Sequence, residues 1–592
     1  TEGRDQVARD ARELLQLFSI GIYKLNLDGS VQTDLLGKPL PAYDEAVIEG
    51  YAHLFTGWTY PPRPGAASQW VNPINYEGRM TLFPDHHDTG AKLILDGAVL
   101  PAGQTPEQDL AQGLDAVFNH PNVGPFIGKQ LIQHLVTSNP SPAYVERVAR
   151  AFNDNGSRVR GDLRTVGLFD GTKLGGRFLV AKDLVLKADQ VYPTTLSRFS
   201  VESAAADGTI TVLPSGASSP VLSAAGELTL RAANIDVQGT LKAPLGRINL
   251  ISSVPNGQVR LASGGVVSVS AEGQLIPFGV TQNGKDWVYE TSPGFFQLVS
   301  ASDLEKRVRL EAGSIRMEAG SMVDVSGGGD AFAYEFVPGP GGSQDQLTAA
   351  AQRNAGASVP NRFAVLPWLT EGSTPYDTAY AKGYELGAGR AVYLDAGAGL
   401  PAGTYLLLPA HYALLPGAFL IEALPGGGNL VPNQQLGLAD GTPVVAGYFK
   451  VAGTAQRDPG LSGFAVYTRE QAMQFSEFRQ SYASSFFGAD AAANGLPIPR
   501  LPGDSGKLTI AAHNNLVLGS DLVTAHAAGS RGAEVDIFAP MLAVLSPGNT
   551  LAGYVTLTTD VLNRLNAESL LLGGERTSSG GKRRIAVDTT RE

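Results

Sequence analysis

The feature that most constrains this 592-residue sequence is a change in the spacing of its apolar residues near residue 165. Before this point apolar side chains recur at steps of three and four residues, the period of a helix with one buried face. After it they form short triplets in which two apolar residues flank a polar one, the period of a β-strand. We therefore expect a mixed two-part chain, with a mainly α module at residues 1–165 followed by a mainly β part.

Several helices are predicted in the first part. Apolar sets with helical spacing begin at Ala8, Val47, Leu110 and Phe126, and the first of them ends at a glycine that suits a helix stop. Ser141-Pro142 opens a further helix, because serine is a good N-cap and proline suits the first helical position.

The triplets of the second part recur at a regular distance. Leu228-Thr-Leu230 is followed by Ile248-Asn-Leu250, a step of 20 residues, and similar triplets return at Val308–Leu310 and Leu508–Ile510. Such recurrence is typical of stacked coils, because one coil cannot bury its inward face alone. We predict right-handed parallel β-solenoid (β-helix) segments with loop and helical insertions. A β-sandwich, which also has short alternating strands, is the alternative.

Breaks in the β pattern divide the second part further. Thr468 begins a capping-box pattern followed by aromatic residues, which predicts a helical insert. The expected divisions are a solenoid segment at 166–342, a linker at 343–365, a β-rich segment at 366–500 with a helical insert near 469–487, and a second solenoid segment at 501–592.

Composition narrows the classes of partner. The chain has no cysteine, which excludes disulfides and thiolate-held metals, and it carries 45 Lys and Arg against 56 Asp and Glu, so nucleic acid is not an expected partner. Three prolines interrupt the most apolar stretch, residues 400–424, so we predict no transmembrane helix. No leader follows Thr1, and we expect any export signal to lie upstream.

The candidate metal ligands are His86, His87 and Asp88. Imidazole and carboxylate groups bind divalent metals, and a nearby carboxylate could serve a metal-bound water as base. Further ligands from neighbouring helices would be His53, His120 and His134, with Glu13 as the base. The spacing matches no strong metal signature, so turn and packing roles are the alternative. We expect no catalytic residue and no cofactor.

Three other acidic residues, Asp162, Asp236 and Asp324, are expected to have structural roles. Arg160-Gly161-Asp162 is an integrin-binding tripeptide in some adhesins, but Asp162 fits a helix N-cap, and we interpret it as structural. Asp236 and Asp324 lie inside strand triplets, where alternation should turn both outward. They are expected to be solvated rather than the paired carboxylates of a polysaccharide-cleaving enzyme.

Blocks of the first part resemble a bacterial family of unknown function, domain family 1800. They are Ala11-Arg12-Glu13-Leu14-Leu15, Phe55-Thr56-Gly57-Trp58, His87-Asp88-Thr89-Gly90-Ala91-Lys92, His120-Pro121 and Val159-Arg160-Gly161-Asp162-Leu163-Arg164. The resemblance covers about residues 1–165, an internal and C-terminal part of that family. It implies a helical fold and no established activity.

Residues 166–592 resemble the filamentous haemagglutinin family of Gram-negative exoproteins, in its C-terminal region. The blocks are Gly167–Gly171, Asp189–Thr195, Leu400–Tyr405 and Gly532–Ile537. This resemblance implies a β-helical shaft exported by an outer-membrane transporter of the two-partner type. An Asn-Pro-Asn-Gly motif of that family's secretion domain is absent, and that domain is expected upstream.

The two resemblances meet between Arg164 and Gly167, so the helical module is either fused or artefactually joined to an unrelated exoprotein segment. We expect a non-catalytic, structural and adhesive protein, outside the cell or on the outer membrane, that binds surface glycans or proteins. The alternatives are a metal-dependent hydrolase-like activity in the helical module and a carbohydrate-processing β-helix.

Overall fold

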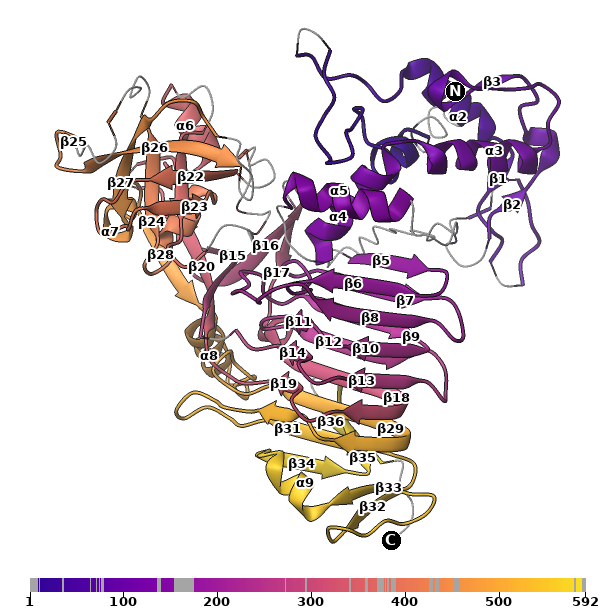
Figure 1. Cartoon of the computed structure of the whole chain (residues 1–592), viewed down its shortest axis with the longest axis vertical. Coiled ribbons are helices and arrows are strands. Elements are labelled where there is room, and N and C mark those ends of the chain that lie inside the picture. The colour runs from indigo at the N-terminus through magenta and orange to yellow at the C-terminus, as the bar shows by residue number, and fades with distance from the viewer. Residues whose placement is uncertain are drawn as a thin grey trace. The chain divides into compact units, whose positions relative to one another are not determined.

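The computed structural model divides the chain into two compact units (Figure 1). One unit comprises residues 1–132 and 142–160, here the N-terminal unit, and the other comprises residues 133–141 and 161–592, here the β-rich unit. The structure describes residues 9, 11–34, 37–63, 65–70, 72–73, 75, 79–135, 140–153, 175–271, 273–292, 295–339, 342–356, 360–369, 377, 380, 383–384, 390–424, 430–431, 436–451, 457–579 and 582–587. Within these ranges no helix has the length and apolar character needed to cross a membrane.

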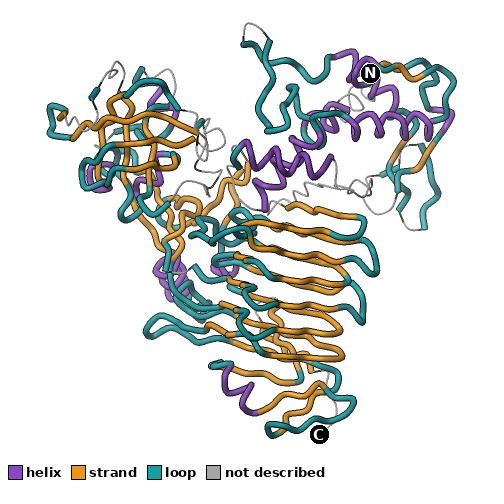
Figure 2. The backbone as a smooth tube through the Cα atoms, in the orientation of Figure 1, coloured by secondary structure: helices purple, strands orange, loops and turns teal. Residues whose placement is uncertain are grey.

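Helices dominate the N-terminal unit, as the apolar spacing predicted (Figure 2). The helices are α2 (Glu45–Leu54), α3 (Pro106–Asn119), α4 (Val123–Leu135) and α5 (Pro142–Asn153), and residues 11–16 are also helical. Between them lie the short elements β1 (Trp58–Thr59), β2 (Thr81–Leu82), η1 (Pro84–His86), β3 (Lys92–Leu93), η2 (Leu95–Gly97) and β4 (Val99–Leu100). The predicted helix opening at Pro142 is confirmed.

Two glycines set how closely the parts of this unit approach. A Cβ atom on Gly50 of α2 would lie 1.7 Å from the carbonyl oxygen of Leu93 in β3, and one on Gly113 of α3 would lie 2.2 Å from Leu54. Only glycine permits these contacts. Helix α2 therefore lies directly against both β3 and α3, which brings the histidine-bearing segment after β2 close to α3.

Parallel strands form the main sheet of the β-rich unit, and Figure 1 shows them stacked one below another. In the described part of the chain this sheet has twelve strands: β5 (Gly175–Val180), β6 (Leu184–Ala188), β7 (Arg198–Ser203), β8 (Thr209–Pro214), β9 (Glu227–Ala232), β10 (Asn234–Val237), β12 (Arg247–Ser252), β13 (Gln258–Leu261), β18 (Arg307–Met317), β29 (Lys507–Leu518), β31 (Glu534–Phe538) and β34 (Ser569–Leu572). A smaller parallel sheet accompanies it: β11 (Thr240–Lys242), β14 (Val266–Ser268), β19 (Met322–Asp324) and β30 (Asp521–Val523).

The predicted right-handed parallel β-solenoid is wrong. Strand β18 pairs with β12 along its first half and with β13 along its second half, so the ladder that descends from β5 to β18 returns through β13, β10 and β8 to β6. The result is one nearly closed, barrel-like parallel sheet. The 20-residue step itself is real, because Leu228 and Ile248 are register partners. The triplets predict the strands and the face that each strand buries, but they do not predict which strands pair to close the sheet.

The interior of this sheet is aliphatic. Side chains at equivalent register positions are fully buried and lie one above another across five strands: Leu228, Ile248, Val308, Leu508 and Val535. Because neighbouring parallel strands are about 4.8 Å apart, such a column is continuous. Each strand is therefore stabilised mainly by the strands on either side of it.

Two further sheets are built from residues between 275 and 482, with strands of the parallel sheets on both sides of them in the sequence. A mostly antiparallel sheet contains β15 (Leu275–Gln282), β16 (Asp286–Ser292), β17 (Phe295–Leu298), β20 (Asp330–Phe336) and β28 (Phe478–Tyr482). An antiparallel half-barrel contains β21 (Arg362–Val365), β22 (Arg390–Leu394), β23 (Gly403–Leu406), β24 (Phe419–Ala423), β25 (Leu436–Gly437), β26 (Pro443–Val451) and β27 (Ser462–Thr468). A bridge between Ala364 and Leu408 ties its two ends together.

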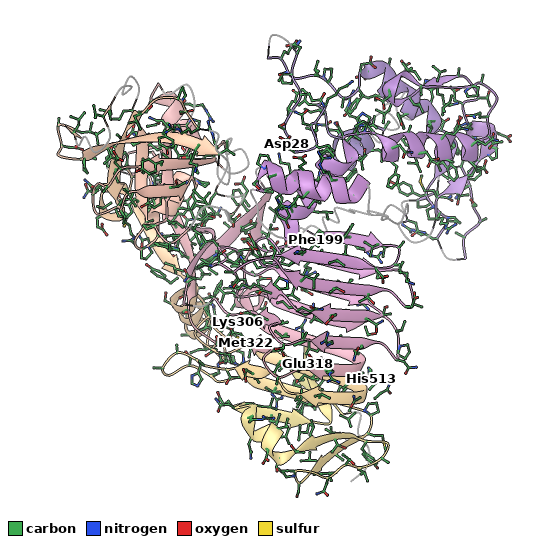
Figure 3. All side chains as sticks on the ribbon, viewed as in Figure 1. Asp28, Phe199, Lys306, Glu318, Met322 and His513 are labelled. Carbon is green, nitrogen blue, oxygen red and sulfur yellow. The ribbon has the colours of Figure 1, made fainter. Side chains whose placement is uncertain are left out.

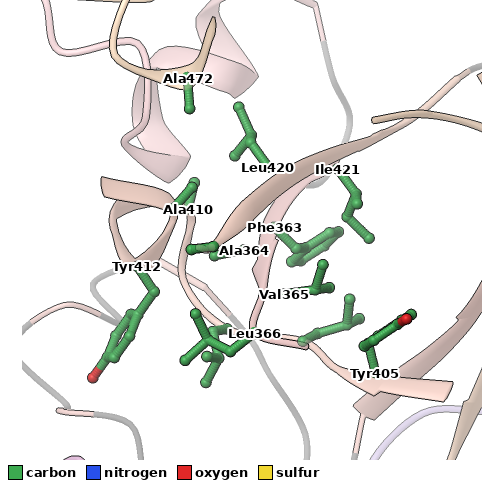
Figure 4. Packing of buried hydrophobic residues seen from close by; sticks show 14 of the residues in the cluster. Phe363, Ala364, Val365, Leu366, Tyr405, Ala410, Tyr412, Leu420, Ile421 and Ala472 are labelled. Carbon is green, nitrogen blue, oxygen red and sulfur yellow. The ribbon is translucent and has the colours of Figure 1, made fainter. Parts of the chain in front are cut away.

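The half-barrel surrounds a core of aliphatic and aromatic side chains (Figure 4). Ile421 of β24 lies beside its register partner Phe363 of β21, and the Tyr412 side chain lies at the margin of this core with the hydroxyl directed away from the aliphatic groups. Residues 343–365, expected to be a linker, contain α6 (Ala349–Asn354) and β21, and they contribute buried residues to this core.

The helical insert expected near residues 469–487 is interrupted by a strand. The capping box of Thr468 and Gln471 is present, but the helix that it starts, α7 (Arg469–Ala472), is short and is followed by β28 and α8 (Ala483–Ala493). The remaining elements are η3 (Ala301–Leu304), η5 (Ala410–Leu414), β32 (Leu542–Leu545), β33 (Val555–Thr558), α9 (Thr559–Arg564), β35 (Gly574–Ser579) and β36 (Lys582–Val587).

Candidate functional site

The three candidate metal ligands point in different directions. The ring of His86, at the end of η1, stacks on Trp70 with 4.0 Å between ring centroids. The next residue, His87, has extended backbone and turns its side chain inward toward α3, while Asp88 turns toward α2. The backbone changes from the 3₁₀ turn of η1 at His86 to an extended conformation at His87, and the three side chains reach different partners rather than one point.

His87 belongs to a buried charge cluster around Asp109 of α3. Its Nε2 atom lies 2.9 Å from Asp109 Oδ2, and Lys92 Nζ lies 2.7 Å from the same oxygen. The Lys92 ammonium also donates hydrogen bonds to the carbonyl oxygens of Asp88 and Gly90. Because buried charges are costly unless paired, this cluster is best understood as a clamp between the segment after η1 and α3.

Asp88 instead pairs with His53 of α2. His53 Nδ1 lies 2.5 Å from Asp88 Oδ2, and the side chains are 39% and 34% exposed. The Asp88 carboxylate also accepts a hydrogen bond from the amide of Gly90, and its own amide donates to Thr56 Oγ1. The hydrogen bond from His53, followed by that from Gly90, lowers the pKa of Asp88 below its ordinary value. A partly exposed histidine held by a carboxylate is an arrangement suited to proton transfer.

The other predicted ligands lie elsewhere in the N-terminal unit. His120 is buried, its Nδ1 accepts a hydrogen bond from the amide of Asn122, and burial lowers its pKa. Glu13 is exposed to solvent. His134 lies in α4, but its side chain is outside the described part of the structure.

A metal centre therefore finds no geometric basis in this region. Within the described residues, no group of three or more His, Asp or Glu side chains is placed to hold a metal ion. The Arg160-Gly161-Asp162 tripeptide and the junction between Arg164 and Gly167 lie outside the described residues.

The two acids of the strand triplets differ from each other. Asp236 faces outward and pairs with Arg260, at 3.2 Å between oxygen and nitrogen. Asp324 does not face outward as predicted: it is buried and accepts hydrogen bonds from the Ser268 hydroxyl and the Ser326 amide. Residue alternation failed here because Asp324 lies beside its register partner Ser268 on β14, which is also buried and donates to it.

The sequence analysis missed a cavity of about 530 Å³ in the β-rich unit. It lies where the five-stranded sheet meets the segment around α6 and η5, and its lining includes Glu290, Phe296, Tyr334, Arg353, Tyr384 and His411. Aromatic rings form much of this wall, and a few charged groups open into it. This combination is typical of small-molecule sites.

A β-bulge shapes one side of the cavity. The register of β15 against β20 shifts between Pro277 and Val280, and Gly279 within this shift has a φ of +68°. A Cβ atom there would lie 2.2 Å from the carbonyl oxygen of Val288, so the position requires glycine. The bulge leaves the Gly279 carbonyl oxygen free of the ladder to accept a 2.6 Å hydrogen bond from the Tyr380 hydroxyl.

Stacked aromatic rings form another part of the cavity wall. The Tyr334 ring stacks on His411 at 4.5 Å, and His411 Nε2 lies 2.7 Å from Asp345 Oδ2. Burial raises the pKa of Tyr334 well above its ordinary value, so its hydroxyl stays protonated. The Tyr384 hydroxyl donates to the carbonyl oxygen of Leu347. These contacts fix the ring positions before any ligand arrives.

No sequence motif marks this cavity. Its lining residues span positions 279–411 and come from separate strands, a helix and a 3₁₀ turn. The only sequence signal is the frequency of tyrosine and phenylalanine between residues 278 and 412, which is equally typical of a core.

Comparison with known proteins gives one finding. Residues 11–168 match the family model described as "Protein of unknown function (DUF1800)". This agrees with the resemblance seen in the sequence blocks of the N-terminal unit. No curated protein and no solved structure matches the chain. These comparisons give no support to the resemblance of residues 166–592 to the filamentous haemagglutinin family.

Proposed function

We propose that the β-rich unit is a non-catalytic binding scaffold and that the chain acts in adhesion at a cell surface or outside the cell. In this proposal the chain reaches the surface of a Gram-negative bacterium through an outer-membrane transporter and binds surface glycans or proteins. The N-terminal unit, of unknown function, accompanies this scaffold as a separate module.

The observation that carries the proposal is the pairing of charges on the outer face of the parallel sheet. Arg260 lies between two carboxylates on neighbouring strands, 3.2 Å from Asp236 and 3.1 Å from Glu318. A second series links neighbouring strands through Arg247, which approaches Glu227 at 3.7 Å and Glu305 at 3.2 Å. Opposite charges are thereby paired between neighbouring segments of this face.

These pairs favour a scaffold over a hydrolase. A glycoside hydrolase needs two carboxyl groups that face one substrate, one of them free to donate a proton. In the two series above the carboxylates are instead neutralised by arginine across the strands, and the arginine lowers the pKa of Glu318 through its hydrogen bond. The acids of this face are thus suited to holding strands together.

A surface-binding experiment tests the proposal. The purified full chain, coated on beads, should bind cells and should leave a panel of neutral and acidic polysaccharides undegraded. Albumin-coated beads are the control. Failure to bind any cell surface would contradict the adhesive role, and release of reducing ends from a polysaccharide would favour the carbohydrate-processing alternative.

The His53–Asp88 pair is the one observation that favours a hydrolase-like activity in the N-terminal unit. It has two metal-binding groups within 2.5 Å of each other but no third ligand among the described residues. Metal analysis of the full chain and of His53→Ala decides this alternative. Stoichiometric zinc that is lost in the variant would support it, and equal trace metal in both would contradict it.

A further inference from the structure

We infer that the cavity beside β16, β17 and β20 is a binding site for an uncharged sugar residue. This inference rests on the proposed function, because it identifies where and by what chemistry the scaffold would take hold of a surface glycan. It begins with two side chains on neighbouring strands. Glu290 of β16 and Phe296 of β17 are register partners, and both line the cavity.

Paired residues of antiparallel strands share one face of the sheet, so a carboxylate and a ring stand side by side. Phe296 is 50% exposed, unusually open for a phenylalanine, whereas Tyr380 and Tyr384 are nearly buried. An open ring can receive the apolar C–H face of a sugar, and the adjacent carboxylate can accept hydrogen bonds from its hydroxyl groups.

The charges of the lining favour an uncharged ligand. Glu290 and Arg353 both line the cavity, and Arg353 Nη1 donates to the carbonyl oxygen of Gly383. His411 is already paired with Asp345. The described lining thus holds charges of both signs beside the hydroxyl group of Thr348, which together suit a ligand rich in hydroxyl groups better than they suit a ligand of either charge.

An organic cation is the main competitor, because aromatic rings with a carboxylate can form a cage for one. Such a cage needs several ring faces turned toward one point. Here the Tyr334 ring stacks on His411, and Tyr380 and Phe478 pack against it at 5.6 and 5.9 Å between centroids. Among the described rings of the lining, Phe296 is the most exposed, which favours the flat face of a sugar over a cage around a cation.

Titration of the full chain with maltotriose, cellotriose, chitotriose and N-acetyllactosamine tests the inference, with binding followed by saturation-transfer NMR. At least one of these sugars should bind, and Phe296→Ala should weaken that binding about tenfold. Leu298→Ala is the matched control: Leu298 is on the same strand, is 64% exposed and does not line this cavity. It should leave the affinity unchanged within about twofold. Glu290→Gln should also weaken binding, with folding of every variant checked by circular dichroism.

Three results would overturn the inference: no binding of any of the four sugars at about 10 mM, equal binding by Phe296→Ala and the unsubstituted chain, or binding of tetramethylammonium in place of the sugars. The bead assay separates this inference from the proposed function. Cell binding that is unchanged in Phe296→Ala would support the scaffold function and show that the cavity takes no part in it. Sugar binding that depends on Phe296, without any cell binding, would support the sugar site and contradict the scaffold function.

Discussion

The parallel sheet and the antiparallel half-barrel bury their side chains in different ways. The parallel sheet contains columns of valine, leucine and isoleucine, with paired charges on its outer face, such as Arg260 with Glu318, the latter labelled in Figure 3. The half-barrel and the sheet beside it add many tyrosine and phenylalanine rings, and the tyrosine hydroxyl groups have specific partners. In the parallel sheet, aliphatic side chains of similar size stack on one another and fill the interior. Large rings with polar ends leave gaps, and the cavity beside β20 is one of them.

The largest expected effect concerns the aliphatic column. Leu310, two residues after Val308 on β18, belongs to the next such column, between its register partners Leu250 and Ile510. Leu310→Ala removes a fully buried side chain from the strand that joins both arms of the parallel sheet. We expect a loss of about 4 kcal/mol in the free energy of unfolding, from lost burial and a residual cavity. Urea denaturation measures it, with Val185→Ala, 60% exposed, as the control. A loss below about 1 kcal/mol would mean that the column does not hold the sheet together.

The second prediction concerns the buried amine of Lys306, at the start of a central strand of the same sheet. Lys306, labelled in Figure 3, directly precedes β18, and its Nζ donates to the carbonyl oxygen of Pro502. Burial lowers its pKa to about 8, against the opposing effect of nearby carboxylates, chiefly Asp504. Between this value and the ordinary lysine pKa near 10.5, the unfolded chain binds the proton and the folded chain does not.

Stability should therefore rise with pH in that window, since ∂ΔG/∂pH is positive wherever the unfolded state binds more protons. Relative to Lys306→Met, the unsubstituted chain should gain about 3 kcal/mol between pH 8 and pH 10.5. Urea denaturation of both proteins across this range measures the difference. A constant difference would show that Lys306 is solvated and that the start of β18 is open to water.

The smallest effect is expected on the aromatic side of the comparison. The Tyr289 hydroxyl donates a 2.6 Å hydrogen bond to Asp377 Oδ1, and both groups are buried. Tyr289→Phe should cost about 2 kcal/mol, the usual value for a hydrogen bond to a charged group. Tyr448→Phe, in a half-exposed stacked pair with Tyr393, should cost less than about 0.5 kcal/mol. Equal costs would contradict the comparison, because a tyrosine hydroxyl in the buried core would then contribute no more to stability than a half-exposed one.

Residues near one another in the sequence allowed the most accurate predictions. The helices of the N-terminal unit follow from the spacing of buried side chains such as Tyr51 and Leu54, and the parallel register follows from the 20-residue step to Ile248. The candidate metal site failed for a local reason as well: the chain leaves the 3₁₀ turn η1 between His86 and His87, and His86, His87 and Asp88 each have a different partner.

By itself, the sequence determined the change from helix to strand near residue 165, the positions of many elements and which face of each strand is apolar, because these depend on the period of neighbouring residues. Only the tertiary structure decided that β18 closes the ladder into a barrel-like sheet, that Asp324 is covered, and that Glu290 and Phe296 share a cavity with His411. Those outcomes depend on contacts between residues far apart in the chain, and their energies are set by how whole sheets pack.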